Sequence, residues 1–520
     1  MGSIGATTHK PSKTKMERTH MINLPDTQAK IEEQKSLFFQ QCSKMLESVE
    51  DAVKAELPIQ QVEQNLFNNV LGLGKLLLSI FVSSSGNGDI GESVEMNGRT
   101  LWRQSDNHLR EYLSIFGLLE VRRAIYAVGP GKKIELAPLD GQLLLPESKF
   151  SYLLQDWSQA IAREQPYNKV SEILLKILGL ALSTNTTSRI GRKLSGEEAN
   201  FWDQVPEPTF DDGVKKSLIS VISADGKGIP MVGQDNITEI FQGDMEKIGH
   251  TKTGKKKMAL LGSVYSIAPY IRTPSDIINA LFSEGSSEDK SASLLRDENG
   301  TGTPSYKVIF DWLGQQHNQR NFDGERLAVV LMDGQKSLWD YVKTVSQSSR
   351  VEILDLLHAC SYAWDATHVF YEKNSDEAKR FAKSQIRVIL SGEIDKVIAD
   401  LRTKAKELNL NKPKLKTIDK VCRYFENNKN RMQYHEYLAA GYPIASGIIE
   451  GACRYVVKDR MERTGMRWVM EGAQAMINLR SISASGFWDD YMAFFIKQES
   501  ARLYPDRATN DDLYSFSRVA

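Results

Sequence analysis

Residues 217–228, Ser217-Leu-Ile-Ser-Val-Ile-Ser-Ala-Asp-Gly-Lys-Gly, decide the predicted fold class. The run up to Ala224 is rich in apolar and β-branched residues, which is typical of a buried strand, and Asp225-Gly226 predicts the turn that ends it. A second run, Arg326-Leu-Ala-Val-Val-Leu-Met, stops in the same way at Asp333-Gly334. Residues 258–267 and 351–355 predict two more strands. Because helical patterns separate these apolar strands, we expect an α/β fold with a sheet covered by helices on both faces.

The rest of the chain divides into blocks of different composition. Apolar residues recur at three- and four-residue spacing before residue 83, and alternate around a predicted β-hairpin within 113–126. Residues 283–305 are polar and Gly/Ser-rich, which predicts a surface loop. The expected organisation is a disordered tail (1–28), a mainly helical N-terminal region (29–97), a β-hairpin followed by a helix-turn-helix-like region (98–205), the first part of the α/β core (206–359), a helical insertion (360–440), the last helices of the core (441–490) and a C-terminal tail (491–520).

Composition excludes several classes of protein. The 520 residues carry 66 basic and 66 acidic side chains, so a uniformly basic nucleic-acid coat is excluded, although local basic patches are not. The 4 cysteines form no CxxC pair, so we expect neither a disulfide scaffold nor a zinc site. The apolar runs fall short of the roughly 20 residues of a membrane span. We therefore predict a soluble cytoplasmic protein without a membrane partner.

Three carboxylates are the candidates for chemistry. Asp225 and Asp333 each follow a predicted buried strand, at the edge where parallel sheets bind ligands, and Glu450 lies in the first turns of a helix predicted to begin after Pro443. Three carboxylates can hold two divalent metal ions for phosphodiester chemistry. Each acid also has an ordinary explanation. Asp-Gly is common in turns, and an acidic residue is favoured in the first turn of a helix.

Several neighbouring residues are secondary candidates. Asp355 also ends a short strand and competes with Asp333 as the second acid, and His358 follows it by one helical turn as an accessory group or a buried structural histidine. The helices around residues 167–194 resemble a helix-turn-helix, or form an ordinary helical hairpin. The basic side chains expected to contact DNA phosphates, unless they are merely solvated, are Lys227, Lys255, Lys256, Lys257, Arg189, Arg192, Arg454, Lys458, Arg463 and Arg467.

The C-terminal stretch carries a family resemblance. Residues 441–450, Gly-Tyr-Pro-Ile-Ala-Ser-Gly-Ile-Ile-Glu, are followed by Arg460-Met and by Gly465-Met-Arg-Trp, and Ala224-Asp-Gly-Lys-Gly-Ile-Pro and Leu331-Met-Asp-Gly precede them. This pattern resembles bacterial insertion-sequence transposases of the Kra type (the ISKra family) over roughly residues 110–490.

The resemblance implies an RNase H-like catalytic core with a helical insertion and a DDE triad of Asp225, Asp333 and Glu450. It further implies two Mg²⁺ ions, for which Mn²⁺ can substitute, and cleavage and strand transfer of DNA. The implied partners are transposon-end DNA, target DNA and further copies of the chain in a dimer or larger assembly, at the nucleoid. The paired cysteines that the family usually has in its N-terminal hairpin are missing around 124–133, so no zinc is expected.

Two other functions stay open at this point. An RNase H-like nuclease would cut DNA without joining strands, and a domesticated or inactive transposase would only bind DNA.

Overall fold

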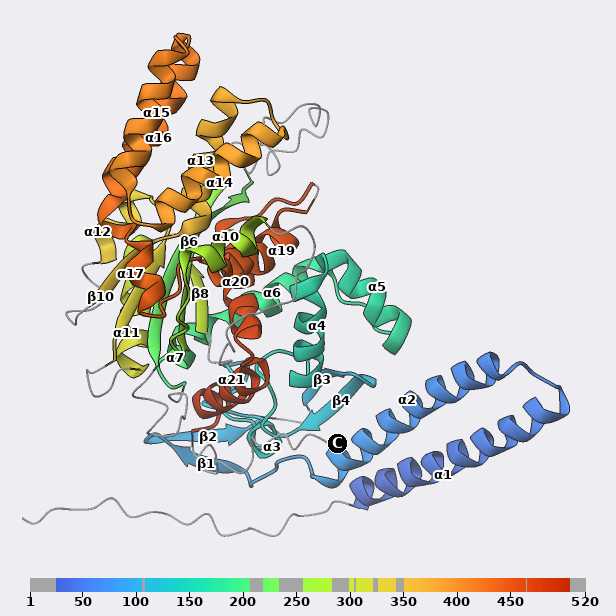
Figure 1. Ribbon diagram of the computed structural model, residues 1–520. Coiled ribbons are helices and arrows are strands. Elements are labelled where there is room, and N and C mark those ends of the chain that lie inside the picture. Colours follow the sequence, from blue (N-terminus) through green and yellow to red (C-terminus); the bar gives the residue numbers. More distant parts are fainter. Residues whose placement is uncertain are drawn as a thin grey trace, which may run out of the picture. The chain divides into compact units, whose positions relative to one another are not determined.

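The computed structural model describes residues 25–104, 108–205, 218–232, 256–282, 299–303, 305–320, 326–342, 350–463 and 465–505 (Figure 1). The chain forms two compact units. The first comprises residues 1–158, 170–182 and 493–520, and the second comprises 159–169 and 183–492. This division differs from the expected boundary at 205, and it assigns most of α5 (Tyr167–Leu178) to the first unit and α6 (Thr184–Leu194) to the second. The predicted helix-turn-helix therefore stays a prediction.

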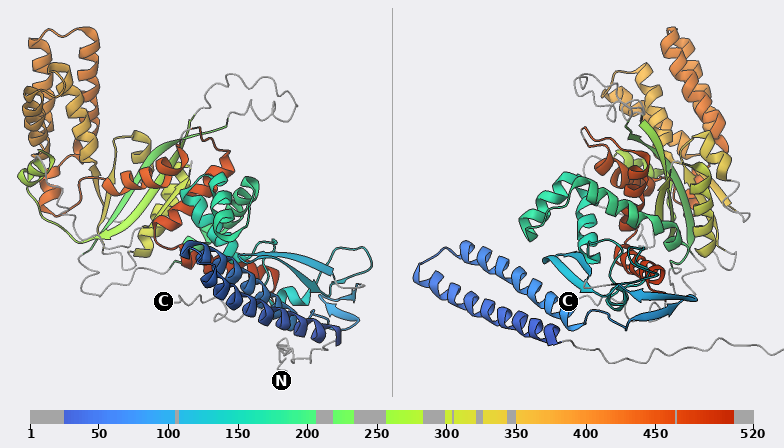
Figure 2. Two further views of the ribbon diagram at one scale, coloured as in Figure 1. Left: turned by 90° about the vertical axis from the view of Figure 1, so that its right-hand side faces the viewer. Right: turned by 180° about the vertical axis from the view of Figure 1, so that it is seen from behind.

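The first unit begins with a pair of long helices. They are α1 (Pro25–Lys54) and α2 (Ile59–Ser84), which run antiparallel on either side of Pro58 (Figure 2). Helix α1 thus starts before residue 28, inside the block expected to be disordered, and residues 1–24 lie outside the described part of the chain.

The predicted hairpin is confirmed as β3 (His108–Ser114) paired antiparallel with β4 (Gly117–Arg123). A second hairpin was missed. Strands β1 (Ser93–Met96) and β2 (Arg99–Arg103) join through Asn97-Gly98, whose φ angles of 52° and 72° suit the tight turns of hairpins. The remaining elements of this unit are β5 (Tyr126–Ala127) and α3 (Pro138–Gln142). Helix α4 (Tyr152–Glu164) is divided between the two units after residue 158.

The second unit contains a five-stranded mixed sheet, of which the sequence predicted four strands. Its strand order is β10-β9-β6-β7-β8, and β6 lies parallel to β9 and antiparallel to β7. Strand β9 is also parallel to β10, and β8 is antiparallel to β7. The strands are β6 (Ile219–Pro230), β7 (Lys256–Ile267), β8 (Asn299–Thr303), β9 (Ala328–Met332) and β10 (Arg350–Leu354). Strand β8 falls inside the predicted loop 283–305, of which 283–298 lie outside the described residues.

Helices cover both faces of this sheet. Helix α11 (Tyr306–Arg320) packs where Gly262 of β7 leaves room, because a Cβ there would lie 2.9 Å from Ile309. The opposite face of the same strand, through Leu261, joins a core with Ile449 and Met476. The predicted covering of both faces is therefore confirmed. Three further helices of the second unit are α7 (Glu198–Trp202), α10 (Pro274–Phe282) and α12 (Lys336–Val342).

A long helical segment follows β10, where the sequence predicted one. Its buried residues join those of β6, β9 and β10 in one core, so it is packed onto the sheet. Figure 1 shows α13 to α16 in orange, rising from the strand ends. The helices are α13 (Leu356–Phe370), α14 (Asp376–Leu390), α15 (Ile394–Glu407), α16 (Lys412–Asn428) and α17 (Tyr434–Ala439).

The predicted helix bearing Glu450 is confirmed, with an irregular middle. It consists of α18 (Gly447–Ala452), a π-helical turn (Cys453–Lys458) and α19 (Asp459–Met461), and α20 (Met470–Ala484) follows. The expectation of a tail from 491 is wrong, because α21 (Trp488–Leu503) continues through Tyr491 and Phe495, which are both buried.

One helix of the described residues, α2, is long and apolar enough by composition to cross a membrane. Its apolar residues are interrupted by polar ones, so counting unbroken runs in the sequence missed it. None of the described residues of α2 is buried.

Candidate functional site

Three carboxylates stand at one level across the parallel part of the sheet. Strand β6 pairs with β9 at Ile222↔Val330, and β9 pairs with β10 at Met332↔Leu354. Continuing these registers sets Asp225 beside Asp333 and Asp333 beside Asp355. Because side chains alternate along a strand, the three acids project from the face that also bears Val221, Leu331 and Ile353.

Asp225 lies inside its strand, which corrects the expectation that Asp225-Gly226 ends it. Strand β6 runs on to Pro230 and stays paired with β7, with Asp225 opposite Leu261. The glycines make this possible, because a Cβ at Gly226 would lie 3.0 Å from the sulfur of Met258. The Asp225 carboxylate accepts a hydrogen bond of 2.6 Å from the backbone N–H of Gly226.

Asp333 follows β9 directly, as predicted. Its Oδ1 accepts a hydrogen bond of 2.9 Å from the backbone N–H of Gln335. The adjacent Gly334 leaves room for the ring of Tyr424 of α16, with which a Cβ at this position would overlap. The glycine is therefore required by this close approach.

Asp355 is fully buried and closely hydrogen-bonded. As the N-cap of α13, its Oδ1 accepts hydrogen bonds from the backbone N–H groups of Leu357 (3.2 Å) and Ser446 (3.0 Å). Its Oδ2 lies 2.7 Å from Nδ1 of His358. Asp355 thus ties the end of β10 to the segment that leads into the Glu450 helix.

Glu450 comes to the same place from a distant part of the chain. Its Oε1 lies 3.9 Å from His358 Nδ1, and both side chains are partly exposed. Ligand atoms of Asp355, His358 and Glu450 all lie within 4.8 Å of one another. The two accessory candidates therefore join one member of the predicted triad in a compact group.

The charges in this group act on one another. Burial raises the pKa of Asp333, and the negative charges of Asp225 and Asp355 add to that rise. Burial also raises the pKa of Glu450, together with the charges of Asp355 and Asp225. The charge of Asp225 thus acts on both other members of the predicted triad.

His358 is the counter-charge within the group. Its hydrogen bond to Asp355 raises its pKa to about 9, assisted by the charges of Asp355, Asp333 and Glu450. Burial alone would raise the pKa of Asp355, but hydrogen bonds from His358 and Ser446 outweigh burial and lower it. The positive charge of His358 therefore offsets the carboxylate of Asp355.

This donor set fits divalent cations that prefer oxygen ligands. Asp225, Asp333 and Glu450 supply carboxylates whose repulsion a cation would relieve, as Mg²⁺ and Mn²⁺ sites require. Asp355 has its oxygens engaged in hydrogen bonds, so it is better suited to hold His358 and Ser446 in place.

Two site residues were missed in the sequence. The charges of Asp333 and Asp355 act on Tyr424, whose pKa is raised chiefly by burial. Cys453, one turn after Glu450, is buried next to Asp225, and burial and that carboxylate raise the pKa of its thiol. The three-residue spacing from Glu450 signals Cys453, but nothing local to α16 signals Tyr424.

The candidate DNA-contacting residues are mostly exposed. Arg454 and Lys458 project from the π-helical turn, and Arg189 and Arg192 from α6. Lys227 is half-buried next to the acids, and Lys256 pairs with Glu462 at 2.8 Å. The remaining exposed candidates are Lys257, Arg463 and Arg467, and Lys255 lies outside the described residues.

Two residues near this surface serve the core instead. Arg460 is buried, donates from Nε to the carbonyl of Ala162 and lies over the rings of Tyr167 and Trp468. Trp468 is also buried, and its Nε1 donates to the carbonyl of Met461.

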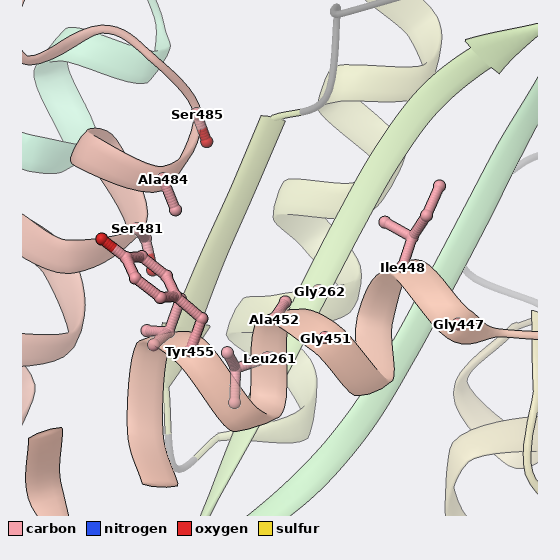
Figure 3. A pocket seen from close by; sticks show the side chains of 11 residues that line it. Leu261, Gly262, Gly447, Ile448, Gly451, Ala452, Tyr455, Ser481, Ala484 and Ser485 are labelled. Carbon is pink, nitrogen blue, oxygen red and sulfur yellow. The ribbon is translucent and has the colours of Figure 1, made fainter. Parts of the chain in front are cut away.

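A pocket of about 260 Å³ lies along the other side of α18 (Figure 3). Gly447, Ile448 and Gly451 form one wall, and Tyr455 and Ser481 lie across it. Glu450 belongs to the same helix but does not line this pocket.

Comparison of the chain with models of known protein families and with curated proteins gives no match.

Proposed function

We propose that this protein is a DDE transposase that cleaves DNA and transfers strands with divalent metal ions. The observation that carries the proposal is the gathering of Asp225 within β6, Asp333 directly after β9 and Glu450 on α18, where the charge of Asp225 acts on both other acids. The residues around these acids are also those on which the resemblance to ISKra transposases rests.

The sheet supports the finer assignment of an RNase H-like fold. In order along the chain, its strands form a three-stranded antiparallel meander, β6-β7-β8, and then two strands, β9 and β10, that add parallel to β6. We propose this fold for residues 218–490, with α13 to α17 as the helical insertion before the Glu450 helix.

The roles of the side chains follow from their positions. Asp225, Asp333 and Glu450 would hold two Mg²⁺ or Mn²⁺ ions, which when bound polarise phosphate oxygens and activate water or a 3′-hydroxyl. Asp355 positions His358 and the Ser446 backbone. His358, kept protonated, offers a positive charge toward a phosphate. Lys227 and the exposed arginines would contact the DNA backbone.

The proposed partners are transposon-end DNA, target DNA and further copies of the chain, acting in the cytoplasm at the nucleoid. Zinc has no role in the proposed mechanism.

The test is a cleavage and joining assay with the full chain, Mg²⁺ or Mn²⁺, and DNA containing the sequences that flank the gene. Asp225→Asn and Glu450→Gln should abolish both cleavage and the joining of pre-cut ends while DNA binding persists. Asp340→Asn, which alters an exposed acid on α12, is the matched control and should retain activity.

The outcomes separate the three candidate functions. Cleavage without joining of pre-cut ends would identify a nuclease. DNA binding without any metal-dependent cleavage would identify an inactive derivative. Full activity of Asp225→Asn or Glu450→Gln would remove that residue from the triad.

A further inference from the structure

The α1–α2 hairpin has a weakly buried internal contact. Along α1, Ile31 and Ala52 are buried and Phe38 and Met45 are half-buried, which marks a row at seven-residue spacing that faces α2. Since none of the described residues of α2 is buried, two helices alone do not cover its apolar surface.

A second apolar row lies beside this internal contact on each helix. On α1, Phe39, Leu46 and Val53 are exposed by 67%, 70% and 74%, again at seven-residue spacing. On α2, half-buried Leu66, Asn69 and Leu76 lie on the side of the internal contact. The residue after each of them is exposed. Together the two rows form what we term the outer stripe: Phe39, Leu46, Val53, Phe67, Val70 and Leu77.

Both rows lie on one side of the hairpin. Each outer residue comes one position after a residue of the internal contact, so it is rotated by about 100° in the same sense along its own helix. Because the helices run antiparallel, these two rotations turn the rows toward the same side. The pairing is supported by Gly72, where a Cβ would lie 3.7 Å from the side-chain nitrogen of Gln41.

The opposite side of the hairpin is mainly polar. Residues one position before the internal contact include Lys44 and Asp51 on α1 and Asn65 and Asn68 on α2, all exposed. The hairpin is therefore apolar on one side and polar on the other, like one half of a helical bundle.

The spacing and the area favour a helical partner. A seven-residue repeat is the pattern by which helices interlock, whereas a lipid surface requires no such register. With about 150–250 Å² for each fully exposed aromatic side chain and somewhat less for Leu and Val, the outer stripe offers roughly 650 Å². Two copies would bury roughly 1,300 Å² in total, the size of a stable interface.

We propose that two copies of this chain associate through the outer stripe, with two α1–α2 hairpins face to face in a four-helix bundle. The interface is isologous, because the same six side chains serve both copies. This association does not depend on the acidic site, so it holds whether or not the proposed transposase activity is confirmed.

The test is the molar mass of the full chain, by light scattering after size exclusion and by sedimentation at micromolar concentration. The wild type should have twice the 58.6 kDa of one chain. Leu46→Lys combined with Val70→Lys should raise the dimer dissociation constant by at least about 100-fold, because charges would be buried against each other. The matched control, Ser48→Lys with Asn68→Lys, adds the same charge outside the stripe and should stay dimeric.

A milder variant guards against misfolding. Phe67→Ala with Val70→Ala keeps good helix formers and should weaken the dimer by roughly 10-fold with unchanged circular dichroism. A monomeric wild type would overturn the proposal, and so would lysine and alanine variants that dimerise as the wild type does. A wild type that is monomeric in buffer but floats with phosphatidylglycerol vesicles would overturn it in favour of a membrane surface.

Discussion

Asp333 and Asp355 end neighbouring parallel strands at one level, yet the protein holds their carboxylates in opposite ways. Asp355 is fully buried and accepts hydrogen bonds from Leu357, His358 and Ser446, and those from His358 and Ser446 lower its pKa despite burial. Asp333 has one backbone donor, Gln335, and its pKa is raised by burial and by neighbouring carboxylates. The two aspartates each follow a buried strand, but hydrogen bonds stabilise the charge of Asp355 and only one backbone donor reaches Asp333.

The difference teaches which acid is available for a cation. A carboxylate with all its oxygens engaged fixes structure, whereas one that is repelled by its neighbours gains most from a bound cation. By this criterion Asp333 belongs with Asp225 and Glu450, and Asp355 holds the site together.

The largest expected effect is that of Asp333→Asn on chemistry. It should lower metal-dependent strand cleavage by at least about 10³-fold, because a carboxylate that would hold metal becomes a neutral amide. The thermal midpoint should stay equal or rise, since a repelled charge is removed while the amide oxygen still accepts from Gln335. Cleavage rate and differential scanning calorimetry on the same preparation check this, and a lowered midpoint would contradict the distinction.

Asp355→Ala should act first on stability. It leaves two backbone N–H groups and His358 without their acceptor, which costs about 3 kcal/mol. The apparent free energy of unfolding in urea, followed by tryptophan fluorescence, measures the loss, with Asp340→Ala as the exposed control. A variant as stable as the wild type would show that Asp355 is not the anchor of the site.

The same contrast separates two histidines on opposite faces of the sheet. His358 is paired with carboxylates, whereas His317 of α11 is buried with Nδ1 2.9 Å from the Ser220 hydroxyl. Burial lowers the pKa of His317 to about 4, and the charges of Arg326 and Arg320 act in the same direction. His317 is therefore neutral in the fold over most of the range in which a free histidine gains a proton.

The stability that His317 contributes should depend on pH with a defined sign. Between its unfolded pKa of about 6.5 and its folded value the unfolded chain binds more protons, so stability is full above that range and falls as pH drops. From pH 7.5 to 5 the loss due to His317 should be about 2 kcal/mol. Urea titrations at both pH values should show a smaller loss in His317→Gln, and equal losses would refute the assignment.

The sequence could predict a strand whose burial is continuous. Residues 328–332 form β9, and all five are buried, because an unbroken apolar run suits a sheet that is covered on both faces. It could not predict that β6 continues past Asp225, because the reason lies across the sheet. Gly226 and Gly228 leave room for the side chains of Met258 and Lys256, which the local pattern does not contain.

The acids themselves could be found from the sequence, but their roles could not. Asp225, Asp333, Asp355 and Glu450 were all candidates, because the pattern predicted each at the end of a strand or in the first turns of a helix. Two contacts distinguish the roles of Asp355 and Asp333: the backbone N–H of Ser446, 91 residues further along the chain, donates to Asp355, and Tyr424 packs against Gly334 beside Asp333. Such contacts arise only when distant segments pack together. The edge strand β8, with two glycines among its five residues, was missed for the same reason.

The smallest expected effect concerns two arginines on one irregular helix. Arg454 is exposed and pairs loosely with Asp459 at 3.8 Å, whereas Arg460 is buried among aromatic rings. Arg454→Ala should weaken DNA binding by roughly 3- to 10-fold and reduce the slope of affinity against salt by about one, because one phosphate contact is lost. Fluorescence anisotropy at several salt concentrations measures both quantities. Arg460→Ala should instead lower thermal stability, since its hydrogen bond to Ala162 holds the core. If Arg454→Ala leaves the salt slope unchanged, Arg454 is not part of the DNA surface, and the other exposed basic candidates remain, among them Lys458 and the arginines of α6.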